Sequence, residues 1–182
     1  MNSAPLVTIY IVCKNYGPYI KESIYSALGQ DYSNIELIII DDGSNDGSPE
    51  LIASITEGLN ITCIYNPNSI GLIRCSNTAL RIANGEYIIR LDADDYLVSD
   101  AINNLVHFAT QNPNAAMIYG NYIEISENGD YIANIIAPSP ADCSFQGIAP
   151  HGACTLFSTN ALKRIGGYSE RHDRQDGFYA VS

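Results

Sequence analysis

Three carboxylates lie within four positions of the chain, and their type and spacing could hold a divalent cation. Residues 87–91 form a mostly apolar run, and Asp92, Asp94 and Asp95 follow it. Inside a buried strand these groups would carry a large desolvation cost, so we expect the strand to end here, at an open edge. Carboxylate oxygens suit Mg²⁺ or Mn²⁺, and a cation held by them keeps positions for phosphate oxygens. The alternative is an acidic surface turn that caps the next helix.

Polar residues follow two other apolar runs in the same way. Asn15 comes after residues 6–13, and Asp41 and Asp42 come directly after residues 36–40. Ligands of parallel sheets gather outside the carboxyl ends of the strands, so this shared placement predicts a single binding site. The two aspartates could accept hydrogen bonds there from a base or a ribose. An N-capping turn would use the same residue types.

The elements that must position these residues follow from the hydrophobic periodicity. In the first half we expect strands over residues 6–13, 36–40, 60–65 and 86–91, and helices over residues 19–28, 48–55 and 72–83. In the second half we expect helices over residues 101–110 and 159–165, strands over residues 115–119 and 147–157, and a hairpin of residues 122–125 and 131–135. The alternation predicts an α/β fold with a mostly parallel central sheet and helices on both faces. We expect a single domain over residues 1–182, with a nucleotide-binding half (1–97) and a half for a second substrate (98–182).

Composition limits the classes of partner. The formal net charge of −11 excludes a nucleic-acid partner, and a phosphorylated ligand would need a bridging metal. No apolar stretch approaches the ~20 residues of a membrane span, and we see no signal-peptide pattern. The five cysteines are scattered, which is typical of reduced thiols. We therefore expect a cytoplasmic protein and leave open a peripheral contact at the inner face of the membrane.

Four residues are weaker site candidates. Arg74 and Asn77 lie on one expected helix, where Arg74 could offset phosphate charge or could be an ordinary exposed residue. His151 and Gly152 could line the side that receives the second substrate. There is no G-x-G-x-x-G or G-x-x-x-x-G-K-[ST] motif, which weakens dinucleotide-binding and P-loop interpretations.

The charged tail offers candidate general bases. Asp173 and Asp176 could each take a proton from a hydroxyl, and His172 could do so on pKa grounds, although a surface histidine is the commoner case.

Taken together, these segments resemble family 2 glycosyltransferases of the GT-A fold. The matching segments, in the order of that family, are residues 7–15, 38–46, 68–77, 85–95 and 165–168. The resemblance extends from about residue 7 to residue 178 and implies a Rossmann-like three-layer sandwich. It also implies a set of residues that bind the nucleotide sugar: Cys13, Asn15, Asp41, Asp42, Arg74, Asn77, Asp92 and Ala93.

The resemblance also implies a reaction. Asp41 or Asp42 would contact the base, Asp92 the ribose or the metal, and Asp94 the Mn²⁺ or Mg²⁺ ion that bridges the diphosphate. Asp176 matches the catalytic base of that family and is preferred over Asp173 for this reason. The implied activity is inverting, metal-dependent transfer from a nucleotide-diphosphate sugar, such as a UDP-sugar, to a hydroxyl of a glycan, polysaccharide or lipid-linked acceptor. Surface polysaccharide and cell-envelope assembly are the usual setting of the family.

The chain departs from the family pattern in four places. Residues 12–15 are Val-Cys-Lys-Asn where Pro-Thr-Tyr-Asn is usual, Ser76 replaces the Arg before Asn77, and Gln175 replaces a Glu. Six residues follow Asp176, so the chain is expected to be C-terminally truncated. The alternative function is a non-catalytic sugar-nucleotide-binding or interaction module. A nucleotidyltransferase would need a Gly-rich, basic loop after the first strand, and the sequence has none.

Overall fold

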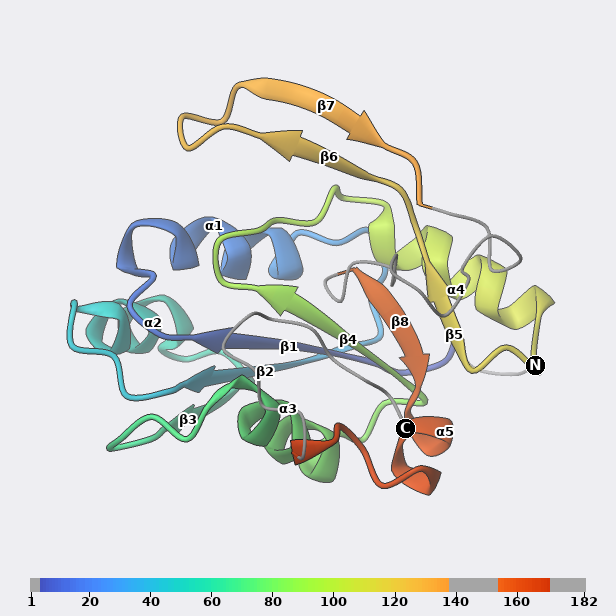
Figure 1. Ribbon diagram of the computed structural model, residues 1–182, viewed down its shortest axis with the longest axis horizontal. Helices are drawn as coiled ribbons and strands as arrows, with labels where there is room; N and C mark the ends of the chain where they lie inside the picture. Colours follow the sequence, from blue (N-terminus) through green and yellow to red (C-terminus); the bar gives the residue numbers. More distant parts are fainter. Residues whose placement is uncertain (1–3, 138–153, 171–182) are drawn as a thin grey trace.

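The computed structural model describes residues 4–137 and 154–170. A six-stranded sheet with the order β3-β2-β1-β4-β8-β5 forms its centre (Figure 1). The strands are β1 (Val7–Cys13), β2 (Ile35–Asp41), β3 (Thr62–Tyr65), β4 (Tyr87–Asp92), β5 (Met117–Tyr119) and β8 (Thr155–Ser158). The first four pair in parallel, whereas β8 is antiparallel to both β4 and β5. The expected mostly parallel central sheet is confirmed.

Helices cover both faces of this sheet. One face packs against α1 (Gly17–Leu28), α2 (Ser48–Thr56) and α4 (Ala101–Gln111), and the other against α3 (Leu72–Ile82) and α5 (Thr159–Arg164). Alternate residues of β1 enter the two cores, since Ile9 and Ile11 pack with α1 while Tyr10 packs with α3. The near-continuous apolar runs of the parallel strands therefore fill two cores, as the three-layer prediction requires.

A separate hairpin stands outside the central sheet. Its strands β6 (Tyr122–Ile125) and β7 (Tyr131–Ile135) form a two-stranded antiparallel sheet at the top of Figure 1, with the bounds expected from the sequence. Within the part of the chain that the structure describes, no helix is both long and apolar enough to cross a membrane.

The element boundaries differ from the sequence expectations by a few residues. Helix α1 begins two residues early, at Gly17, because Pro18 fits the first turn. Strand β5 begins late, at Met117, because the backbone N–H of Ala115 still bonds the carbonyl of Asn112 in the turn after α4. Of the strand expected over residues 147–157, the described part forms β8 (Thr155–Ser158), and residues 147–153 lie outside the described ranges.

Candidate functional site

The carboxyl ends of three neighbouring strands bring the predicted aspartates to one edge of the sheet. In the pairing register Cys13 of β1 lies beside Asp41 of β2, and Val12 lies beside Asp92 of β4. The strands β1, β2 and β4 point in the same direction, to the left in Figure 1. The sequence placed these residues at strand ends, and the register makes those ends neighbours.

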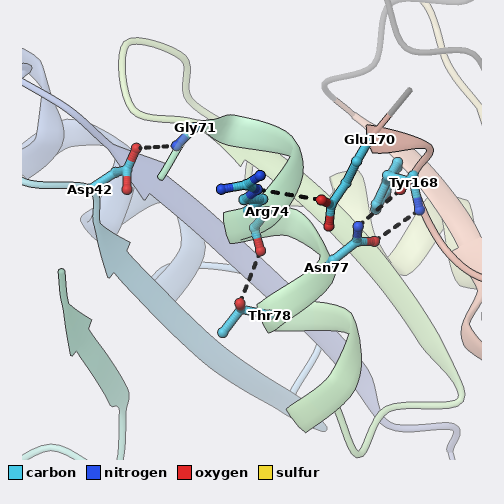
Figure 2. A network of polar contacts seen from close by, with 7 residues as sticks. All are labelled: Asp42, Gly71, Arg74, Asn77, Thr78, Tyr168 and Glu170. Carbon is cyan, nitrogen blue, oxygen red and sulfur yellow. Dashed lines mark hydrogen bonds and ion pairs between the residues drawn. The ribbon is translucent and has the colours of Figure 1, made fainter. Parts of the chain in front are cut away.

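The buried carboxylate of Asp42 accepts four hydrogen bonds from the loop between β3 and α3. Its Oδ1 accepts the side-chain amide of Asn66 at 2.9 Å and the backbone N–H of Ile70 at 2.8 Å. Its Oδ2 accepts the hydroxyl of Ser69 at 2.7 Å and the backbone N–H of Gly71 at 3.0 Å, the contact drawn in Figure 2. Each oxygen therefore has two donors, which fills its lone-pair positions.

These contacts fix the charge of Asp42. Burial opposes its ionisation, but the hydrogen bonds from the loop outweigh burial and lower its pKa from 3.8 to about 2. Asp42 is thus a permanent negative charge at neutral pH that orders the loop leading into α3.

Asp41 is also buried, but one of its oxygens has no donor. Its Oδ2 accepts the backbone N–H of Ser44 at 3.1 Å, whereas Oδ1 has no hydrogen-bond partner among the described residues. A buried acceptor without a donor is unfavourable, so an N–H or O–H group from a ligand would stabilise this position. Two residues after Asp41, Gly43 has a φ of 74°, and a Cβ there would lie 2.8 Å from the backbone nitrogen of Ser69. Glycine is needed because the two loops approach so closely.

Asn15 ties the first strand-end loop to the second. It adopts a left-handed conformation (φ 60°), its N–H donates to the hydroxyl of Ser44 at 2.9 Å, and its Oδ1 accepts the N–H of Asn45 at 2.9 Å. The carboxylate of Asp46 accepts the N–H of Gly17 at 2.9 Å, which holds the start of α1 to the same loop. Hydrogen bonds between the loops after β1 and β2 therefore hold the rim of the site in place without a ligand.

The side chains of Cys13 and Ala93 do not face the rim. Both are buried in the core on the α1 side of the sheet, and burial raises the pKa of the Cys13 thiol. The carbonyl of Cys13 accepts the N–H of Asp42 at 2.7 Å, so this residue joins β1 to the turn after β2.

Asp92 ends β4 with both of its carboxylate oxygens facing an arginine. The Nε of Arg90 lies 2.7 Å from Oδ1, and its Nη2 donates to Oδ2 at 3.0 Å. The hydroxyl of Ser23, on α1, donates to the backbone carbonyl of Asp92 at 3.1 Å. Both the side chain and the backbone of Asp92 are therefore held.

Asp94 and Asp95 follow in an exposed turn, closed by the bond from the N–H of Asp95 to the carbonyl of Asp92 at 3.1 Å. The negative charge of Asp94 is the main cause that raises the pKa of the phenol of Tyr16, in the loop after β1. The turn after β4 therefore lies near the loop after β1, with the carboxylate of Asp94 exposed.

The exposed carboxylate of Asp94 fits a divalent cation that takes most of its other ligands from substrate and water. Within residues 4–137 and 154–170 there is no group of three His, Cys, Asp or Glu side chains that could hold a metal. Mg²⁺ is usually bound by one or two carboxylates together with phosphate oxygens and waters, and does not need a complete protein cage. The exposed oxygens of Asp94 meet that requirement.

Arg74 and Asn77 point from α3 toward the segment after α5 (Figure 2). The side-chain amide of Asn77 donates to the carbonyl of Tyr168 at 2.9 Å, and its Oδ1 accepts the N–H of Tyr168 at 2.9 Å. The Nε of Arg74 lies 3.3 Å from a carboxylate oxygen of Glu170, with both side chains more than half exposed. The structure thus gives both residues protein partners, and their contacts with a ligand stay predictions.

Several predicted residues lie outside the described ranges, namely the base candidates Asp176, Asp173 and His172 and the acceptor-side candidates His151 and Gly152. Their roles stay predictions.

Sequence reasoning missed Arg90, Asn66 and Ser69. The signal for Arg90 was available, because an arginine in an apolar strand two residues before Asp92 must share its face. No local signal identified Asn66 or Ser69, since they bond to Asp42 from 24 and 27 positions away.

Comparison with known proteins points to one family. The model of the family described as "Glycosyl transferase family 2" matches residues 8–166. The chain is 36% identical over 163 residues to the Escherichia coli UDP-Glc:alpha-D-GlcNAc-diphosphoundecaprenol beta-1,3-glucosyltransferase WfaP, covering 88% of this chain and 62% of WfaP. It is 34% identical over 135 residues to the hyaluronan synthase of Pasteurella multocida, covering 74% of this chain and 14% of the synthase.

Solved structures show the same fold. The mannosyltransferase PcManGT from Pyrobaculum calidifontis, in complex with GDP-Man and Mn²⁺, superposes with a TM-score of 0.73 at 24% identity over 92% of this chain and 48% of that one. Staphylococcus aureus TarS 1-349 in complex with UDP superposes with a TM-score of 0.72 at 19% identity, over 93% of this chain and 52% of the TarS chain. These matches confirm the expected GT-A fold. The chain spans 55% and 62% of the length of two curated relatives that it matches, and about half of these solved structures.

Proposed function

The chain belongs to glycosyl transferase family 2, and on that basis we propose that it transfers a sugar from a nucleoside diphosphate sugar to a hydroxyl group of an acceptor. The observation that carries this proposal is the gathering of carboxylates at the ends of β2 and β4, the two strands that flank β1. Asp41 offers a buried oxygen without a donor, Asp42 fixes the loop before α3, and Asp94 is exposed at the rim. A nucleoside offers N–H and O–H donors for the free oxygen of Asp41. A diphosphate with its cation suits the exposed carboxylate of Asp94.

We assign the roles by position. Of the two candidates for the base, Asp41 is preferred, because its Oδ1 has no donor among the described residues while Asp42 already accepts four hydrogen bonds. Asp92 and the backbone of Ala93 lie beside the ribose. Asn15 and the backbone of Cys13 form the wall after β1. Arg74 and Asn77 lie on α3, which borders the site.

Asp94, with Asp92 as the second candidate ligand, would hold Mn²⁺ or Mg²⁺. When bound, such a cation offsets the charge that develops on the diphosphate leaving group. The strongly acidic chain agrees with this requirement, because a dianionic diphosphate would otherwise meet a surface of the same charge.

We propose Asp176 as the general base of an inverting reaction. Its carboxylate takes the proton of the acceptor hydroxyl, the acceptor oxygen bonds to the anomeric carbon, and the bond from that carbon to the phosphate oxygen breaks. The electron pair of that bond leaves with the nucleoside diphosphate, and inversion follows from a single in-line displacement.

For the donor and acceptor we propose a UDP-sugar and a glycan or lipid-linked hydroxyl, used at the cytoplasmic face of the membrane. WfaP is named for UDP-Glc and a diphosphoundecaprenol acceptor, and TarS has been solved with UDP and with UDP-GlcNAc. PcManGT has been solved with GDP-Man, so GDP is the main competitor.

Calorimetric titration of the full chain tests the donor site. UDP, GDP and CDP are each titrated with Mn²⁺ and with EDTA. We expect UDP to bind in Mn²⁺, binding to weaken at least about tenfold in EDTA, and Asp94→Ala to behave as the EDTA sample does. Asp130→Ala, an exposed aspartate in the turn of the remote hairpin, is the matched control and should bind as the wild type does.

The outcomes separate the candidate functions. Folded protein that binds none of the three nucleotides would overturn the donor site. Binding without release of UDP from UDP-sugars in the presence of glycan or lipid-linked acceptors would favour a non-catalytic sugar-nucleotide-binding module. Release of UDP that Asp176→Asn abolishes while nucleotide binding persists would support the general base.

A further inference from the structure

Arg90 is a buried cation within the apolar strand β4. It lies between Ile89 and Leu91, which are fully or almost fully buried, and only 8% of Arg90 is exposed. Its neighbour on β1 in the pairing register is the buried Tyr10. A guanidinium in such surroundings is tolerated only when an anion is close.

Asp92 is the anion that Arg90 meets. Residues two apart on a strand share a face, so both side chains lie on the α3 side of the sheet. The contacts at 2.7 Å and 3.0 Å use both carboxylate oxygens, and 25% of the Asp92 side chain remains exposed. The contact from Nη2 to Oδ2 is a hydrogen bond and the one from Nε to Oδ1 is a close ion-pair contact, so the carboxylate is held at two points, which a single lysine ammonium would not reproduce.

Stability alone does not explain the pair. Replacement of a buried ion pair by well-packed apolar residues is often neutral or stabilising, so Met or Leu would serve the core equally well. The position of the pair is informative instead, because Asp92 stands at the rim and Asp94 follows two residues later in an exposed turn. Arg90 gives a partner to the first aspartate of this Asp-x-Asp motif.

We propose that Arg90 is a positioning residue that holds Asp92 as a fixed hydrogen-bond acceptor for the donor and keeps it from serving as a metal ligand. A cation at Asp92 would have to displace or lie beside a guanidinium of the same sign, whereas Asp94 carries its charge at the exposed rim. Asp94 is therefore the metal ligand of the motif, and Asp92 faces the nucleoside. This inference rests on the proposed function, and it decides between the two roles considered for Asp92.

Titration of the full chain with Mn²⁺ alone, followed by electron paramagnetic resonance of the free ion, tests the inference. Arg90→Met removes the charge and keeps the apolar stem. We expect this variant to bind Mn²⁺ about tenfold more tightly than the wild type does, because Asp92 becomes available. The double variant Arg90→Met/Asp92→Asn should return to the wild-type affinity. Arg90→Lys, which keeps the charge, should also stay near the wild type.

Either of two results would overturn the inference. One is an unchanged Mn²⁺ affinity in folded Arg90→Met. The other is a gain in Mn²⁺ affinity that persists in the double variant with Asp92→Asn.

A second experiment applies if Arg90→Met does not fold. Asp92→Asn and Asp94→Asn, each in the otherwise native chain, are then titrated with Mn²⁺ and UDP together to show which aspartate ligates the metal. Asp94→Asn should then weaken Mn²⁺ binding about tenfold or more, and Asp92→Asn should change it less than about twofold. An equal loss in both would show that Asp92 ligates the metal.

The titration with Mn²⁺ alone is independent of turnover. A wild-type chain that binds no nucleotide would overturn the proposed function, while the comparison of Arg90→Met with its Asp92→Asn double variant would still test the role of Arg90.

Discussion

At the scale of single residues, Asp41 and Asp42 are adjacent in sequence and differ in their surroundings. Both residues are 2% exposed, yet Asp42 has four donors while Oδ1 of Asp41 has none among the described residues. Asp41 is the last residue of β2, whereas Asp42 begins the turn after it and bonds to the loop before α3. Their chemistry therefore differs because the fold gives them different neighbours.

The donors around Asp42 predict an acid-sensitive contribution to stability. Its pKa is about 2 in the folded protein against 3.8 normally, so the contribution is complete above about pH 4 and is lost as the pH falls toward 2. Asp42→Asn should lower the free energy of unfolding at pH 7 by about 1–2 kcal/mol, because an amide cannot accept from all four donors. Urea unfolding between pH 2 and pH 7 measures both effects.

The control for Asp42 is Asp130→Asn, at an exposed position in the hairpin turn. This variant should follow the wild type over the whole pH range. If Asp42→Asn kept the full loss of stability between pH 4 and pH 2, other carboxylates would account for it and the assignment to Asp42 would be wrong.

At the scale of elements, α3 connects two parts of the site. The loop at its N-terminal end surrounds Asp42, and its middle turns hold residues 168–170 through Asn77 and Arg74 (Figure 2). Gly167 lies against this contact with a φ of 80°, and a Cβ there would come within 2.6 Å of Oδ1 of Asn77. The Gly-Gly turn after α5 thus has a packing reason at its second glycine.

Substitution on α3 tests this connection. Asn77→Ala removes both hydrogen bonds between its side chain and the backbone of Tyr168 in a partly buried place, so we expect a loss of about 1–3 kcal/mol and faster hydrogen exchange at the Tyr168 amide. Thr78→Ala is the matched control on the same helix. It removes a hydrogen bond from a hydroxyl to the carbonyl of Arg74 within the helix and should cost less than about 0.5 kcal/mol.

The kinetics would add a second readout. Because residues 168–170 lead in sequence toward Asp176, Asn77→Ala should lower kcat more than it weakens UDP binding. Equal exchange rates at Tyr168 in the two variants would argue against the connection.

At the scale of the whole molecule, the two cores protect three of the five thiols. Cys13 is buried on the α1 side and Cys75 on the α3 side, and Cys154 packs against the first core. Burial is the main cause that raises the pKa of all three, with Cys75 at about 12. A thiolate is the reactive form, so these thiols are expected to be unreactive while the chain is folded.

Thiol labelling at pH 8 with mass-spectrometric identification tests this expectation. Cys13 and Cys75 should label only as fast as the chain opens globally, and a denaturant should accelerate both together. Rapid labelling of either cysteine in the native protein would contradict the burial of the corresponding face of the sheet.

The sequence alone determined which segments form strands and helices, because hydrophobic periodicity and turn residues lie in contiguous stretches of chain. It also placed Asp41, Asp42 and Asp92 at strand ends and indicated the family. Only the tertiary structure decided what each side chain contacts. Asn77 bonds to Tyr168 across 91 positions, and the donors of Asp42 come from the loop after β3. Hydrogen bonds between distant segments depend on how the sheet and helices pack, and no local pattern specifies that packing.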